Sequence, residues 1–175
     1  MFDRLDISLS RTFAAIVPFS FALLGVFLSN APISLLRAAV PPPMFSLMPI
    51  YFWCLVRPDL MPAWVAFLIG VMEDFFSGGP PGVWTLSFVV TYALVDRERD
   101  AFAGLSGIGA ILGFAAAMLV ATLCGWLIGA FVYGRLPPLS MLAMQFAMSV
   151  IFYVPVALIL GRVHRRIVGP LRSDF

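Results

Sequence analysis

The 175-residue chain is 62% hydrophobic and only 11% charged, and its eleven basic residues are all arginine. A soluble domain carries about twice that charge density, and a mean hydropathy of +1.01 leaves too little polar surface to cover a globule in water. These values exclude a soluble enzyme, a disordered region and a secreted disulfide scaffold. The net charge of +2 is too small to indicate a nucleic-acid partner. The sequence predicts one integral membrane domain over residues 1–175.

Apolar windows between the charged residues predict the helices, because a helix that crosses a bilayer needs roughly 17–25 apolar residues. The apolar runs are continuous and do not alternate as barrel strands do. Pro41-Pro42-Pro43 shortens the second window, and Ser77–Gly82 forms a turn between the third and fourth helices. We predict an all-α, polytopic fold of six segments, of which the second to fourth are short. They span residues 12–36, 44–56, 62–76, 83–95, 104–131 and 137–161.

The first segment is interpreted as a membrane span, with a cleaved signal peptide as the alternative. The leading stretch Met1–Arg11 carries two aspartates, and the apolar run that follows exceeds the usual 7–15 residues of a signal peptide. A retained span therefore fits the sequence better.

The distribution of arginines predicts the orientation of the chain in the membrane. With six crossings, one side receives nine arginines and the other receives only Arg37 and Arg135. Cytoplasmic loops carry the excess of arginine in membrane proteins. Both termini are therefore predicted to be cytoplasmic.

Small residues recur every four positions along the fifth predicted helix. The stripe comprises Gly109, Gly113, Ala117, Ala121, Gly125 and Gly129. Small residues at this spacing form a groove where a second helix backbone can approach closely. The stripe favours packing within the chain, and docking of a helix from another protein is the alternative.

An acidic pair, Glu73-Asp74, lies within the third predicted helix. Acids in a span are costly and usually face the interior of a helix bundle or a cavity. Gly70 and Asp74 share a helix face because they are four residues apart. Arg37 and Arg135 are the predicted counter-charges. A salt bridge or a hairpin cap is favoured over a partner contact, and an ion or substrate site is a third interpretation.

No catalytic or metal-binding pattern is visible in the sequence. Cys54 and Cys124 have no neighbouring cysteine or histidine, and His164 lies among arginines that suit a basic patch facing anionic lipid. No nucleophile–base set and no phosphate-binding glycine loop occurs. We therefore predict no enzymatic activity, no cofactor and no metal.

Several motifs follow one another within residues 49–82: Pro49-x-Tyr51, Arg57-Pro58, Gly70-x-x-x-Asp74 and Ser77-Gly78-Gly79-Pro80-Pro81-Gly82. Their order, in a chain with six predicted spans, resembles the MreD family of rod shape-determining proteins. The resemblance and the stripe together mark a set of partner-binding or structural residues. The set comprises Arg57, Pro58, Gly70, Glu73, Asp74, Gly78, Gly79, Gly82, Gly109, Gly113, Gly125 and Gly129.

The resemblance implies a subunit of the bacterial cell-elongation machinery in the inner membrane. It implies MreC as a direct partner, together with a RodA-type glycosyltransferase, a penicillin-binding transpeptidase and, indirectly, MreB. It also implies a fold similar to the substrate-binding subunits of energy-coupling-factor transporters. The favoured function is a non-enzymatic scaffold that supports peptidoglycan synthesis and rod shape. A substrate-binding, vitamin-type transporter subunit is the alternative.

Overall fold

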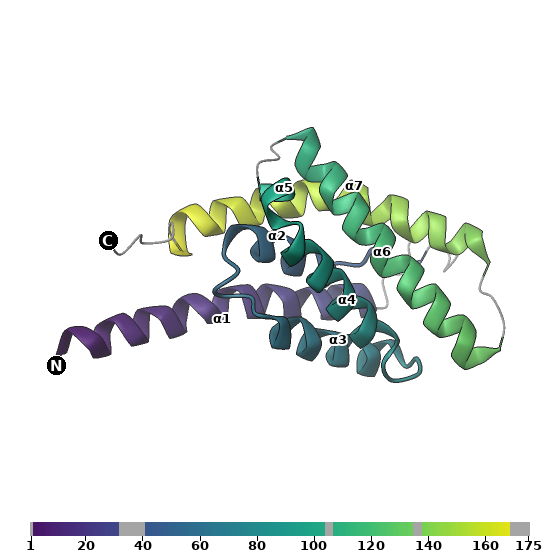
Figure 1. Ribbon diagram of the computed structural model, residues 1–175, viewed down its shortest axis with the longest axis horizontal. Helices are drawn as coiled ribbons and strands as arrows, with labels where there is room; N and C mark the ends of the chain where they lie inside the picture. Colours follow the sequence, from purple (N-terminus) through teal and green to yellow (C-terminus); the bar gives the residue numbers. More distant parts are fainter. Residues whose placement is uncertain (1, 32–40, 104–106, 135–137, 169–175) are drawn as a thin grey trace.

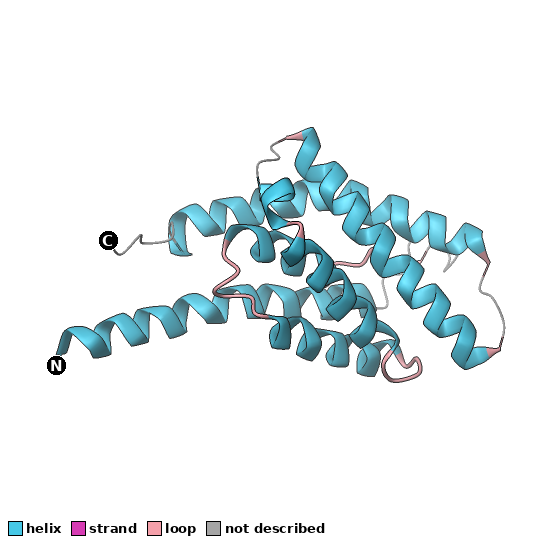
Figure 2. Ribbon diagram, in the orientation of Figure 1, coloured by secondary structure: helices cyan, strands magenta, loops and turns pink. Residues whose placement is uncertain are grey.

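The computed structural model describes residues 2–31, 41–103, 107–134 and 138–168, and within these ranges it is helical with no strand (Figure 2). The all-α class is confirmed for these residues. The helices are α1 (Phe2–Asn30), α2 (Leu47–Val56), α3 (Ala63–Ser77), α4 (Val83–Arg97), α5 (Arg99–Ala103), α6 (Ile108–Tyr133) and α7 (Leu139–Val163), followed by a π turn at His164–Val168.

The helix bounds differ from the predicted segments in several places, and α2 begins at Leu47 and not at residue 44. The helix α1 begins at Phe2, ten residues before the predicted start, and residues 32–36 of that prediction lie outside the described ranges. The short helix α5 was not predicted, because it lies between the fourth and fifth predicted segments. The charged residues there form local ion pairs such as Arg99–Asp96, at 3.7 Å.

Length and hydropathy together mark two candidate spans among the described helices. Among the described residues, Ile108–Tyr133 and Leu139–Ile167 are long and apolar enough to cross a membrane. The helices α3 and α4 have 15 residues each, and α2 has 10. At 1.5 Å per residue, α2 covers about 15 Å, roughly half of a hydrocarbon core.

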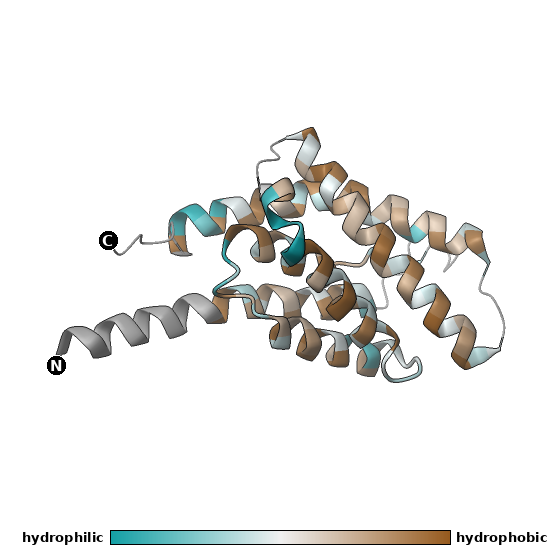
Figure 3. Ribbon diagram, viewed as in Figure 1, coloured by the Kyte–Doolittle hydropathy of each residue, from teal (hydrophilic) through white to brown (hydrophobic). Residues whose placement is uncertain are grey.

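The two ends of the molecule differ in composition. The start of α1, the turn before α3 and the end of α7 lie toward one end of the long axis, whereas the α3–α4 hairpin, the end of α6 and the start of α7 lie toward the other (Figure 1). Hydrophilic residues gather at the α4–α5 junction and at the end of α7, while α6 is mainly hydrophobic (Figure 3).

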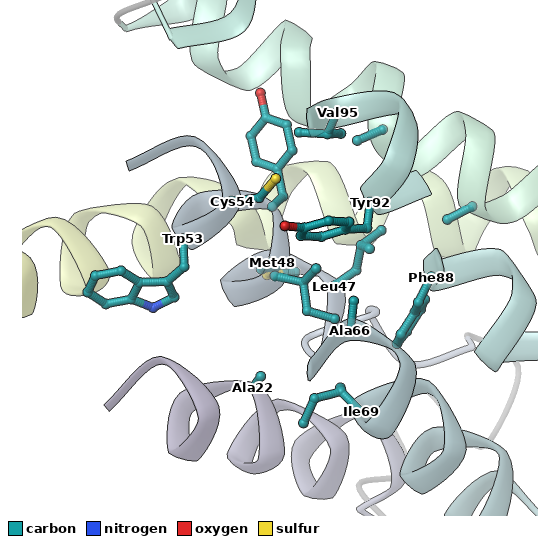
Figure 4. Packing of buried hydrophobic residues seen from close by; sticks show 14 of the residues in the cluster. Ala22, Leu47, Met48, Trp53, Cys54, Ala66, Ile69, Phe88, Tyr92 and Val95 are labelled. Carbon is teal, nitrogen blue, oxygen red and sulfur yellow. The ribbon is translucent and has the colours of Figure 1, made fainter. Parts of the chain in front are cut away.

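The short helix α2 forms the centre of the bundle. Side chains from α1, α3 and α4 surround Leu47 and Met48, and Cys54 lies against Tyr92 (Figure 4). Tyr51 makes edge contacts with the rings of Phe114 and Tyr153, at centroid distances of 5.5 and 5.7 Å. A helix that is buried on all sides is apolar all round, as α2 is.

The segment just before α2 lacks helical hydrogen bonds and depends on serine side chains. The amide of Phe45 donates to Ser29 Oγ of α1 at 2.9 Å, and the amide of Met44 donates to Ser149 Oγ of α7 at 2.9 Å. Gly25 allows this close approach, because a Cβ there would lie 2.6 Å from the carbonyl oxygen of Phe45. Buried backbone groups need such partners, above all in a membrane.

The helices α3 and α4 pack closely because Gly70 has no side chain. A Cβ at Gly70 would lie 2.6 Å from the Cα atom of Thr85, which is a backbone atom and cannot turn aside. The contact lies one helical turn before Asp74, on the same face of α3.

Gly70→Ala is expected to destabilise the protein by about 1–3 kcal/mol, because the added methyl group forces the backbones apart. Gly129→Ala is the matched control: among the described residues nothing lies within 4 Å of the Cβ position, so alanine should stabilise α6 by about 0.5–1 kcal/mol. Thermal unfolding in detergent measures both. Equal effects of the two substitutions would contradict the close approach at Gly70.

Candidate functional site

The carboxylate of Asp74 binds the N-terminus of α4. Its Oδ1 atom accepts a hydrogen bond from the amide of Trp84 at 2.8 Å. Its Oδ2 atom accepts from the amides of Gly82 and Thr85, at 2.8 and 3.1 Å, and from Thr85 Oγ1 at 2.5 Å. The first amides of a helix have no partner within it, and a negative charge is favoured there. Asp74 therefore caps α4 from the preceding helix.

Glycines shape the turn that brings α4 back to Asp74. Gly78 and Gly82 have φ angles of 64° and 101°, in the left-handed region that other residues rarely adopt. Gly79 lies between them, where a Cβ would meet Ser77 Oγ at 3.5 Å. The Ser77 hydroxyl donates to the carbonyl oxygen of Asp74 at 3.2 Å, which closes the end of α3.

Glu73 has a different environment from its neighbour. It is only 3% exposed, and its Oε1 atom accepts a hydrogen bond from Asn30 Nδ2 of α1 at 2.8 Å. The Ser46 side chain lies beside the same carboxylate. Neither Glu73 Oε2 nor Ser46 Oγ has a well-formed hydrogen bond to a described residue.

Two hollows meet beside the acidic pair. A recess of about 120 Å³ is lined by Glu73, Asn30, Pro43 and Gln145, among others. A second hollow of about 260 Å³ lies between the α3–α4 hairpin and the pair α6 and α7, and it shares Ser77, Trp84 and Gln145 with the first.

The small-residue stripe of α6 packs mainly against this chain. A Cβ at Gly113 would overlap Tyr51 Oη, and one at Gly125 would lie 3.3 Å from the Trp84 ring. Gly113, Ala117, Ala121, Gly125 and Gly129 are buried, and Gly109 is half-buried. Intramolecular packing thus fills the stripe between Gly113 and Gly125, and a foreign helix has no room there. Gly129 instead faces the 260 Å³ hollow.

Arg57 and Pro58 form the turn between α2 and α3. Arg57 donates to Asp59 through Nε at 2.9 Å and through Nη2 at 2.8 Å, and the residue is 8% exposed. This hydrogen bonding raises the pKa of Arg57. Paired nitrogen–oxygen contacts of this kind fix the geometry of a turn. Arg57 lies at the opposite end of α3 from Asp74, so the two are not parts of one site.

Arg37 and Arg135, the predicted counter-charges, lie outside the described residues. The described partners of Asp74 are instead backbone amides and a hydroxyl group. The sequence analysis did not identify Asn30 or Ser46, which come from other parts of the chain. The available signal was only that Asn30 is a polar residue inside the predicted first span.

Asp74→Asn is expected to destabilise the protein by about 2–3 kcal/mol, because an amide NH₂ group would face amides that are themselves donors. Thermal unfolding in detergent measures this change. Glu98→Gln is the control, since Glu98 is exposed in the α4–α5 junction and its loss should cost less than about 1 kcal/mol. An unchanged melting temperature for Asp74→Asn would contradict the capping role.

Comparison with known proteins identifies the family. A family model described as "rod shape-determining protein MreD" matches residues 10–163. No curated protein and no solved structure matches the chain. The match covers nearly the whole chain and confirms the resemblance drawn from residues 49–82. The chain therefore belongs to the MreD family of membrane proteins, which act in rod-shape determination.

Proposed function

We propose that this protein is a non-enzymatic scaffold of the cell-elongation complex in the bacterial inner membrane. In this proposal it binds MreC directly and supports a RodA-type glycosyltransferase and a penicillin-binding transpeptidase, with MreB as an indirect partner. The family match supports the role in cell shape. The description of the matching family concerns cell shape and not transport, so the family match gives no support to the transporter alternative.

The proposed topology has six crossings and two cytoplasmic termini. The arrangement of the helices supports this topology. The turn before α3 lies toward the same end of the molecule as the start of α1 and the end of α7 (Figure 1). The likeness to energy-coupling-factor subunits stays a prediction.

The outer face of α3 is the proposed docking surface for MreC. Trp64, Phe67, Leu68 and Phe75 recur at helical spacing and are 63%, 49%, 38% and 78% exposed. Aromatic side chains are enriched at the energetic centres of protein interfaces. This aromatic face, on the hairpin fixed by Asp74, is the observation that carries the proposal.

Trp64→Ala/Phe75→Ala is expected to reduce recovery of MreC by at least tenfold in an affinity pull-down from gently solubilised membranes. The reason is that the substitutions remove two aromatic anchors without touching the core. Quantitative mass spectrometry of the co-purified proteins measures the recovery.

Ile151→Ala/Leu158→Ala is the matched control, because these two α7 residues are 62% and 57% exposed and should face lipid. It should leave the recovery of MreC unchanged. Equal recovery with the α3 and α7 variants would move the docking surface away from α3. If the unmodified protein recovers no MreC, the scaffold proposal itself is wrong.

The proposed topology predicts that a fluorescent protein fused to the C-terminus is fluorescent and that alkaline phosphatase fused at the same point is inactive. Phosphatase folds actively only outside the cytoplasm, so the two reporters have opposite requirements. A fusion after Gly79, in the α3–α4 hairpin, should give the reverse pattern. Phosphatase activity at the C-terminus would contradict six crossings with cytoplasmic termini.

A further inference from the structure

The exposed face of α7 ends in a cluster of arginines. Arg162, Arg165 and Arg166 are all exposed, and they are three and four residues apart, so they are neighbours on one surface of the helix and the π turn that follows it. Hydrophilic residues gather at this end of α7 (Figure 3). We propose that the arginine cluster binds the phosphate headgroup of an anionic phospholipid.

The same face of α7 is apolar before it reaches the arginines. Ile151, Val154 and Leu158 are 62%, 40% and 57% exposed, and their helical spacing continues to Arg162. In the candidate span Leu139–Ile167, 11% of the apolar window is buried within the chain, against 39% for the other candidate span. An exposed apolar stripe on a membrane helix is covered by lipid chains, so the arginines where it ends lie at the level of the headgroups.

Two contacts hold the end of α7 against the core and leave the arginines outside. Leu160 is fully buried, and the ring of His164 packs edge-on against Trp53 of α2 at a centroid distance of 5.8 Å. Leu160 and His164 share the inner face because they are four residues apart. The Arg165 guanidinium reaches back beside Gly161, where a Cβ would lie 3.6 Å from Nη1. Long basic side chains at helix ends reach the headgroup level in this way.

The positive charge at the end of α7 is in excess, unlike the charge at the α4–α5 junction. Residues 162–175 include four arginines and one aspartate. Residues 96–100 instead have three acids and two arginines, which form ion pairs such as Arg97–Glu98 at 3.6 Å. An excess of arginine beside a membrane attracts lipids with net negative charge, and a guanidinium group binds phosphate oxygens in pairs.

A phospholipid matches both parts of this face, because its phosphate meets the arginines while its chains cover the apolar stripe. Inorganic phosphate matches only the arginines. A lipid is therefore the ligand that the whole face fits.

Native mass spectrometry of the purified full chain in a neutral detergent tests the proposal. Phosphatidylglycerol and phosphatidylcholine with the same chains are titrated separately, and the bound lipid is counted. Phosphatidylglycerol should bind at least tenfold more tightly, because choline cancels the charge of the phosphate in the other lipid. Equal affinity for the two lipids would overturn the proposal.

Arg165→Gln/Arg166→Gln should lower the affinity for phosphatidylglycerol at least tenfold, since each arginine near a lipid surface contributes roughly a factor of five. The affinity for phosphatidylcholine should stay the same. Both side chains are exposed, so the melting temperature in detergent should also stay the same. Arg97→Gln/Arg99→Gln is the matched control, because it removes two arginines from the α4–α5 junction and should keep the lipid affinity. Equal losses in the two variants would mean a diffuse charge effect and no site on α7.

Two further outcomes separate a lipid from other ligands. Sodium phosphate at constant ionic strength should not displace phosphatidylglycerol at an equal concentration, and displacement would assign the cluster to phosphate alone. If Arg165→Gln/Arg166→Gln keeps its lipid affinity but loses a co-purifying protein, the cluster is a protein interface and the lipid proposal is wrong. The lipid measurement uses the isolated chain, so its outcome is separate from that of the scaffold proposal.

Discussion

The carboxylate of Asp74 at the start of α4 is the interaction on which the rest of the fold depends. It fixes the end of α3 to the first turn of α4, and Gly70 lets the two backbones touch one turn earlier. The helix α4 can then present Trp84 and Ser87 to the small-residue stripe of α6. In a medium without water, helix amides need an internal acceptor, and a carboxylate is the strongest that the chain supplies.

The two adjacent acids, Glu73 and Asp74, thus differ in where their hydrogen-bond partners come from. Asp74 accepts four hydrogen bonds at the start of α4, so its partners all come from its own hairpin. Glu73 instead accepts a hydrogen bond from Asn30 of α1 and lies beside the Ser46 side chain. The same helix therefore carries one acid that joins it to the next helix and one that joins it to distant parts of the chain.

Much of this arrangement could be predicted from the sequence. The prolines and glycines of residues 77–82 predicted the hairpin, and the four-residue spacing predicted that Gly70 and Asp74 share a face. A hairpin cap was among the favoured roles of the acidic pair, but the amides that Asp74 accepts from could not be predicted, because no pattern in the sequence shows which backbone groups face a side chain. Asn30 and Ser46 reach Glu73 only through the tertiary fold, so no local pattern connects them.

The hydrogen bond from Met44 to Ser149 joins residues that are 105 positions apart. The ribosome makes Met44 long before it makes α7, so this amide has no native acceptor during most of synthesis. The hydrogen bonds of the segment that leads into the central helix α2 are therefore complete only after α7 has been made. A nascent chain that stops short of α7 leaves this buried amide, in the middle of the bundle, without the acceptor that it has in the folded protein.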